Sequence, residues 1–343
     1  MSEQRVEGKQ ITGYCVPWSL RAGESIRLHA SSHTPGDATI DVVRLSCGDP
    51  TRSGPGFAES ETDVVHAEVE LNDQPLLPGS WGRIDLAGLV ARQRLVWRLA
   101  VRATRPHEPQ DIAAVGDVSI HLDEAGALVA RRGDDQVTVR TQTLDPRRWY
   151  RIDVALDCVT GRTDVTVAPN ASASPGRDAR ERSISVGRLD GASGPIDVVE
   201  MLLATASTRD TPATTQGNFD GRIGDVSLSV DDERLRWDLA QAMDSPRIVC
   251  TRGDRHGDLY QLPTRGITGP GWTGDEQRWR DAPEQYNAVH FHKDDLYDAG
   301  WDTTLDLELP ADLPSGIYCF RVTQNHGDPD GDRKSTRLNS SHR

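Results

Sequence analysis

The chain has 343 residues, of which 36% are hydrophobic and 27% charged, and its formal net charge is -14 at pH 7. The length allows two or three domains with their own cores. The acidic balance argues against nucleic acid and membrane surfaces as partners, because both need a basic patch. No apolar run approaches the roughly 18 residues of a membrane helix. The first residues carry no apolar signal core, so we expect a cytoplasmic protein.

The first part of the chain, residues 1–92, is predicted to be the first part of a β-sandwich. Helical periodicity is nearly absent, and short apolar and β-branched runs alternate with polar residues, which is typical of all-β proteins. Asp49–Gly56 contains two prolines and two glycines and is predicted to be a loop. The expected strands are Gln10–Val16, Ser25–Ser31, Ala38–Cys47 and Val64–Leu71.

The second part, residues 93–235, is predicted to form a jelly roll, because many antiparallel strands follow one another at regular spacing. A hairpin turn is expected at Gly161, and Asn170–Arg182 is expected to be a loop. The expected strands are Leu95–Val101, Val118–Leu122, Ala127–Arg131, Gln136–Thr141, Trp149–Asp157, Thr163–Ala168, Met201–Ser207 and Phe219–Val230.

The third part, residues 236–325, is predicted to hold connecting loops, chiefly Gly253–Trp279, and the rest of the β-sandwich. In the last strand, Tyr318, Phe320 and Val322 share one face, which belongs on a core. We therefore expect an all-β fold in which a discontinuous immunoglobulin-like sandwich is interrupted by an inserted jelly roll. The expected strands are Asn287–His292, Thr303–Leu309 and Ser315–Thr323.

The final residues, 326–343, are predicted to be a disordered tail. Within them, residues 332–343 resemble the translation of a common sequencing adapter, so we expect this stretch to be an artefact. The use of lysine agrees with this reading. Among 39 Lys and Arg residues, lysine occurs only at Lys9, Lys293 and Lys334, and the third lies inside the suspect stretch.

Two stretches resemble the two signature strands of a laminin-G or concanavalin A-like jelly roll. They are the run Phe219–Leu228 and the run Trp149–Asp157 with its following turn. In this reading Phe219 and Ile223 pack inward, and Gly221 lets its strand pass close to a neighbour.

A second resemblance covers nearly the whole chain and points to the N-terminal portion of the large (beta) subunit of bacterial N,N-dimethylformamidase. The family hydrolyses the C–N bond of N-substituted formamides. The motifs that carry the resemblance are Ile11-Thr-Gly-Tyr-Cys15, Ala22-Gly-Glu-Ser-Ile-Arg27, Val43-Arg-Leu45, Gly54-Pro-Gly-Phe57, Trp237-Asp-Leu239, Gly271-Trp272 and the run from Pro283 to Trp301.

The family resemblance also implies partners and a cofactor. It implies a C-terminal catalytic domain in which tyrosines and a glutamate hold iron, a small helical subunit, and a homo-oligomeric assembly. None of the iron ligands has a counterpart in residues 1–343, so the resemblance assigns no catalytic, cofactor-binding or metal-binding residue to this chain. We expect no cofactor in this portion.

Three local groups could carry chemistry. His290 and His292 would share one face of a strand, with Asp294 and Asp295 following, as in a two-histidine metal site; a strand end with exposed imidazoles and acids is the simpler interpretation. Asp254, His256 and Asp258 could offer ligands to calcium, although a solvated loop fits them better. The third group could stack sugars or serve as packing anchors, and it comprises Trp272, Trp279, Trp301 and Tyr286.

Cysteine usage adds no further site. The cysteines are odd in number, widely spread and without a CxxC pair, so buried free thiols are expected rather than a disulfide framework or a zinc site. They are Cys15, Cys47, Cys158, Cys250 and Cys319.

The leading hypothesis is therefore a non-catalytic scaffold region of a dimethylformamidase-like amidohydrolase. Two alternatives stay open. The first is a carbohydrate-binding or adhesion module built on the jelly roll, and the second is a soluble β-protein with only an interaction role. The sequence contains no nucleophile elbow, phosphate-binding loop or dinucleotide fingerprint that would favour another enzyme class.

Overall fold

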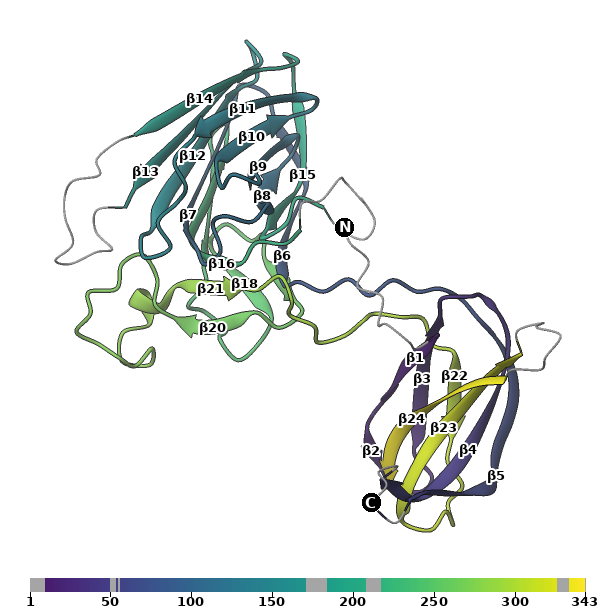
Figure 1. The fold of residues 1–343 in the computed structure, drawn as a ribbon. Coiled ribbons are helices and arrows are strands. Elements are labelled where there is room, and N and C mark those ends of the chain that lie inside the picture. The colour runs from purple at the N-terminus through teal and green to yellow at the C-terminus, as the bar shows by residue number, and fades with distance from the viewer. Residues whose placement is uncertain are drawn as a thin grey trace. The chain divides into compact units, whose positions relative to one another are not determined.

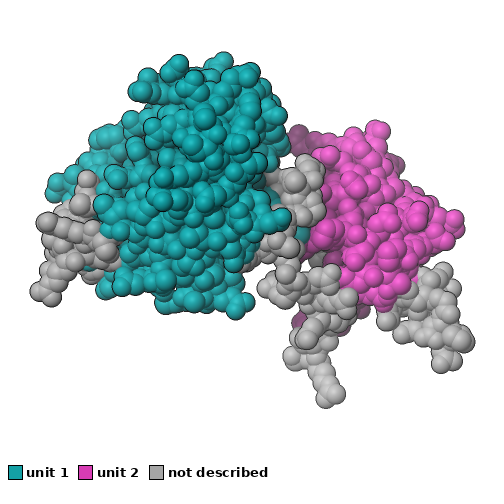
Figure 2. All heavy atoms as spheres, turned by 90° about the horizontal axis from the view of Figure 1, so that it is seen from above, with its two compact units in different colours: residues 1, 77–297 teal, residues 2–76, 298–343 magenta. Residues whose placement is uncertain are grey.

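A computed structural model describes residues 10–49, 54, 56–170, 184–207, 217–325 and 333–342. The chain divides into two compact units, which are residues 77–297 (unit 1) and residues 2–76 with 298–343 (unit 2), coloured separately in Figure 2. The predicted all-β fold is confirmed. The described residues contain strands and one short 3₁₀ helix, η2 (Pro283–Tyr286). None of their helices has the length and apolar character needed to cross a membrane.

Unit 2 is built from two sheets (Figure 1). The smaller sheet has the order β1-β3-β22 and is antiparallel. The larger has the order β2-β24-β23-β4-β5. The strands are β1 (Ile11–Val16), β2 (Ser19–Leu20), β3 (Ser25–Ser32), β4 (Gly36–Asp49), β5 (Gly56–Leu71), β22 (Leu305–Glu308), β23 (Gly316–Asn325) and β24 (Arg333–His342).

Apolar side chains from both sheets form the core of unit 2. Ile26 and Leu28 come from β3, while Ile40, Phe320 and Val322 come from β4 and β23. Tyr318 packs in the same cluster, so the predicted inward face of the last strand is confirmed. This is alternation of period two with one face on a core.

Unit 1 contains one extended sheet of 16 strands. Its main path runs β11-β10-β9-β8-β15-β6-β19-β18-β17-β16-β7-β12-β13-β14, with β21 joined to β16 and β20 to β21. The strands are β6 (Trp81–Ala91), β7 (Arg94–Ala103), β8 (Gln110–Val115), β9 (Val118–Leu122), β10 (Leu128–Arg132), β11 (Asp135–Arg140), β12 (Tyr150–Asp157), β13 (Arg162–Pro169), β14 (Ser185–Asp190), β15 (Ile196–Leu203), β16 (Gly221–Val230), β17 (Glu233–Asp238), β18 (Arg247–Arg252), β19 (Gly257–Tyr260), β20 (Thr264–Ile267) and β21 (Ala288–Phe291).

The sheet of unit 1 folds over a single large core. Its two end strands face each other, because a Cβ added at Gly187 of β14 would lie 2.9 Å from the Val139 side chain of β11. Phe219 and Ile223 are fully buried in this core, as the sequence predicts. A Cβ at Gly221 would lie 2.7 Å from the carbonyl oxygen of Arg102, so only glycine allows this close strand approach.

The unit boundaries differ from the predicted parts of the chain. The predicted jelly roll spans residues 93–235, whereas unit 1 runs from 77 to 297. The reason is strand pairing. Strand β6, whose residues fall within the predicted first part, pairs with β15 and β19, and β21 pairs with β16. The predicted loop Gly253–Trp279 contains β19 and β20, so strands β18 to β21 within residues 236–297 join the larger sheet.

Two segments of the chain are predicted to be irregular. Residues 333–342 of the predicted disordered tail form β24, which pairs with β23 along its whole length. The open edge of β23 offers a row of main-chain hydrogen-bonding groups, which gives even a polar segment a place to pair. Residues 326–332 and 343 lie outside the described residues, as do residues 171–182 of the predicted loop Asn170–Arg182.

All five cysteines lie within the described residues and form no disulfide. Four are buried, while Cys47 is half-buried. Burial raises the pKa of the Cys15 thiol to about 12, so this thiol stays protonated at neutral pH. The predicted buried thiols are therefore found at every position except Cys47.

Candidate functional site

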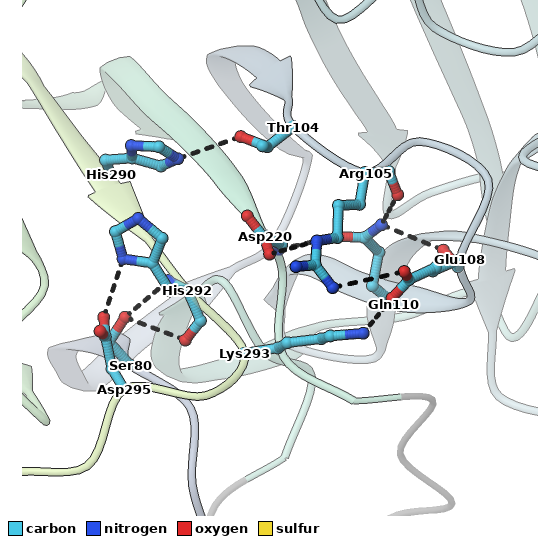
Figure 3. A network of polar contacts seen from close by, with 10 residues as sticks. All are labelled: Ser80, Thr104, Arg105, Glu108, Gln110, Asp220, His290, His292, Lys293 and Asp295. Atoms are coloured by element: carbon cyan, nitrogen blue, oxygen red, sulfur yellow. Dashed lines mark hydrogen bonds and ion pairs between the residues drawn. The ribbon is translucent and has the colours of Figure 1, made fainter.

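A connected set of polar side chains in unit 1 lies where the chain enters and leaves this unit (Figure 3). The two main-chain segments lie side by side. The Gly79 N–H donates to the Asp295 carbonyl at 2.8 Å, and the Ser80 N–H donates to the His292 carbonyl at 3.0 Å. The His292 N–H in turn donates to Ser80 Oγ at 3.0 Å. We call the ten residues labelled in Figure 3 the crossover network; they are Ser80, Thr104, Arg105, Glu108, Gln110, Asp220, His290, His292, Lys293 and Asp295.

The two histidines of the network come together as the sequence predicts. His290 lies in β21 opposite Arg222 of β16, and its ring centroid is 4.1 Å from that of His292. His290 Nε2 lies 3.0 Å from Thr104 Oγ1. Burial, with the neighbouring His292 next in effect, lowers the pKa of His290 to about 4, so its ring is neutral at pH 7.

His292 is oriented by a carboxylate rather than by a second imidazole. Its Nδ1 lies 3.1 Å from Asp295 Oδ2, while Asp294 is exposed. No three His, Cys, Asp or Glu side chains of the described residues are arranged to hold a metal ion. The imidazoles of His290 and His292 are half-buried, so the group differs from the simpler predicted alternative, a strand end with exposed imidazoles and acids.

Asp220 is the buried acid of the network. It is 5% exposed, and its Oδ1 has no hydrogen-bond partner among the described residues. Its Oδ2 lies 3.5 Å from Arg105 Nε. Burial outweighs this cation and raises the pKa of the Asp220 carboxyl above its ordinary value. This carboxyl can therefore hold or release a proton closer to neutrality than an exposed aspartate can.

The loop between β7 and β8 closes the other side of the network. Gln110 Oε1 accepts the Asp220 N–H at 2.7 Å, and its Nε2 donates to the carbonyls of Arg105 and Glu108. Lys293 forms an ion pair with Glu108, and this hydrogen-bonded cation lowers the pKa of Glu108. Charged groups of both signs thus hold the exit segment against the β7–β8 loop.

The sequence did not single out Ser80, Thr104, Arg105, Glu108 or Asp220. Asp220 follows Phe219 at the start of a predicted strand, where an acid normally marks an exposed position. Its neighbours in space are far from it in the chain. No spacing signal exists for such a group, because β16, β21 and the β7–β8 loop meet only through sheet pairing.

The second predicted group, Asp254, His256 and Asp258, is occupied by structural contacts. His256 Nδ1 accepts the Cys250 N–H at 3.1 Å, and Asp258 lies 4.0 Å from Arg247. Asp254 is exposed. The three side chains therefore do not converge as calcium ligands must.

The aromatic group is divided between the two units. Trp272 Nε1 and the Tyr286 hydroxyl both donate to the Glu276 carbonyl, at 2.8 and 2.9 Å, and so fix one loop of unit 1. Trp301 belongs to unit 2, where its Nε1 donates to the Pro75 carbonyl at 3.0 Å. Trp279 lies beneath the Arg280 guanidinium at 5.2 Å from the ring centroid. All of these contacts lie within one unit, and Trp279 is 38% exposed, so the predicted choice between packing anchors and a sugar-stacking platform stays open.

The described residues define an all-β protein of two units. Its similarity to known proteins points to one family. Residues 264–331 match a family model described as N,N-dimethylformamidase beta subunit-like, C-terminal. The chain is 24% identical over 374 residues to the N,N-dimethylformamidase beta subunit of Paracoccus aminophilus, and 24% identical over 369 residues to that of Alcaligenes sp.

Both alignments cover 91% of this chain and 47% of the relative. The chain therefore spans about half the length of the curated relatives it matches. The resemblance to the N,N-dimethylformamidase beta subunit family is confirmed over nearly the whole chain.

Among solved structures, a native heptameric SAP-like pentraxin from Limulus polyphemus matches 56% of this chain and 75% of its own, at 12% identity and a TM-score of 0.32.

Proposed function

We propose that this chain is a scaffold region of a dimethylformamidase-like amidohydrolase and is not catalytic on its own. In the full-length protein the reaction would be hydrolysis of the C–N bond of N-substituted formamides. The supporting observation is similarity to two dimethylformamidase beta subunits along 91% of the chain, while only 47% of each relative is matched. The remaining half of such a relative offers ample room for a catalytic domain.

The proposal includes a cofactor and partners that lie outside this chain. Iron would be held by the catalytic domain, and a small helical subunit would complete a homo-oligomeric cytoplasmic assembly. The name of the relatives, beta subunit, supports the existence of a partner subunit. The crossover network would serve structure, since each of its charged groups holds a segment of unit 1 in place.

Metal analysis tests the proposal that iron is held outside this chain. The purified chain is dialysed against ferrous or ferric iron and then against a weak chelator, and its iron content is measured by mass spectrometry. We expect far less than one iron per chain, because the described residues bring no three suitable ligands together. Retention of one iron per chain would overturn the proposal.

A carbohydrate-binding module is the second candidate, favoured by one observation. Trp81 and Tyr260 stack on each other with ring centroids 4.1 Å apart, and Tyr260 is 38% exposed. Exposed aromatic faces can stack on sugar rings. A glycan array separates the candidates, because the scaffold proposal expects no specific signal. Binding that is abolished by Tyr260→Ala would favour the carbohydrate-binding module.

A further inference from the structure

Strand β24 occupies one strand position of unit 2 with a polar sequence. It lies between β23 and β2, antiparallel to the first and parallel to the second (Figure 1). Its 10 residues pair with β23 along the whole length of that strand, and Leu338 is the one apolar residue among them. Main-chain hydrogen bonds between strands form with almost any extended sequence. The pairing of β24 therefore does not by itself indicate a matched side-chain fit.

The strand position next to β23 borders the core of unit 2. Tyr318, Phe320 and Val322 of β23 pack in that core. Residues directly opposite each other on paired strands share one face of the sheet. On the β4 side, Val42 and Ile40 stand opposite Phe320 and Val322 and continue the core. A strand on the other side of β23 can continue it in the same way.

On the β24 side, the same face changes from apolar to polar. The register places Ser340 opposite Tyr318 and Thr336 opposite Val322. Leu20 of β2, across this strand position, is buried in the core of unit 2. Apolar core residues therefore lie on both sides of a position that β24 fills with mainly polar residues. Because burial of apolar surface favours strand pairing, a segment with apolar residues at these positions should pair more strongly than β24.

The family match separates β24 from the strand that it pairs with. Residues 264–331 match the dimethylformamidase model, so the match includes β22 and β23 and stops before β24 begins at Arg333. Residues 332–343 are also the stretch that is predicted to be derived from a sequencing adapter. The matched part of the chain thus supplies the acceptor strand β23 but not the strand beside it.

We propose that the strand position between β2 and β23 is an acceptor site for an extended segment with apolar residues at alternate positions, supplied by the rest of the dimethylformamidase-like polypeptide. The segment would run antiparallel to β23 and place its apolar residues opposite Tyr318, Phe320 and Val322. In such pairing the main chain gives affinity, and the side chains at alternate positions give specificity. The source of the segment rests on the proposed function, whereas the acceptor site rests on unit 2 alone.

Substitutions within β24 test the positions that face the core. One variant carries Thr336→Val and Ser340→Val at two of these positions. The matched control carries Ser335→Val and Ser341→Val at neighbouring positions, which face away from the core. We expect the first pair to slow amide exchange in residues 316–325 about tenfold, because the valines extend the core, and the control pair to change it far less. Equal effects of the two pairs, or no effect of the first, would overturn the proposal.

A peptide added to the full chain tests the acceptor site directly. The probe is a fluorescein-labelled peptide with the sequence of β24 and valine in place of Thr336 and Ser340. The shifted peptide has the same sequence with valine in place of Ser335 and Ser341. The chain carries Leu338→Asp, which weakens its own β24 by placing a charge at a core-facing position. Fluorescence anisotropy should show saturable binding of the probe, about tenfold tighter than binding of the shifted peptide.

Circular dichroism checks that the Leu338→Asp chain is folded, and where it is not, the valine comparison within β24 decides. A folded chain that does not bind the probe, or that binds both peptides equally, overturns the acceptor site. These outcomes are independent of catalysis. Probe binding by a chain that proves to release dimethylamine would refute the proposed function and leave the acceptor site standing. Failure of binding by an inactive chain would refute the acceptor site alone.

Discussion

His121 illustrates how a single side chain of unit 1 links stability to pH. It lies in β9 and is 1% exposed, and its Nδ1 has no hydrogen-bond partner among the described residues. Burial, assisted by the charge of Arg131, lowers the pKa of His121 to about 4. Because the unfolded chain binds this proton near pH 6.5 and the folded chain only near pH 4, stability is complete above pH 6.5 and falls between these values.

We therefore expect His121→Leu to weaken the loss of stability on acidification. The titration of His121 accounts for at most about 3 kcal/mol between pH 6.5 and 4. Calorimetric melting of both proteins across this range measures the difference. His290 titrates in the same direction, so the variant should keep part of the pH dependence. Identical pH profiles for the two proteins would contradict a buried neutral His121.

Individual turns of unit 1 are joined by side chains that replace missing main-chain partners. The Asp231 carboxylate accepts the N–H groups of Arg92, Gln93 and Arg94 at 2.8 to 3.0 Å, and so ties the β6–β7 turn to the β16–β17 turn. Asp231→Asn keeps the shape but removes the charge. We expect a loss of about 1–2 kcal/mol in the free energy of unfolding. The exposed neighbour Asp232→Asn is the control, and an equal effect there would contradict this role.

Arg265 acts on a longer element. Its guanidinium donates to the carbonyls of Leu239, Gln241, Ala242, Ser245 and Arg247 and so holds the β17–β18 connection. A lysine cannot reproduce this planar set of donors. Arg265→Lys should cost about 2 kcal/mol and speed amide exchange in residues 239–247. Arg278→Lys, at a 72% exposed side chain, is the matched control. Unchanged exchange in the Arg265 variant would contradict this assignment.

Strands with clear alternation could be predicted closely, and strands defined by their neighbours could not. Val118–Leu122 is a strand with the predicted bounds, because its apolar and β-branched residues alternate. Strand β6 was missed because Gly82, Asp85 and Gly88 lower its local preference. Its position between β15 and β19 outweighs that preference. The five carbonyls around Arg265 are brought together by tertiary structure alone, so no local sequence pattern predicts their contact with Arg265.

The two units of the whole molecule have separate cores. All the core residues of unit 1 lie between Ile84 and Phe291, whereas the core of unit 2 joins Ile11–Leu71 to Leu309–Val322. We expect residues 77–297, expressed alone, to fold with one calorimetric transition. Residues 2–76 alone should remain unfolded, because they lack β22 and β23. An unfolded 77–297 fragment would contradict the independence of unit 1.

The most direct measurement for the whole molecule is the release of dimethylamine from N,N-dimethylformamide by the purified chain supplied with iron. The complete dimethylformamidase of Paracoccus aminophilus, assayed in parallel, is the positive control. We expect the control to release amine and this chain to release none above buffer. Amine release that rises in proportion to the concentration of this chain would show a reaction centre within it and contradict the scaffold assignment.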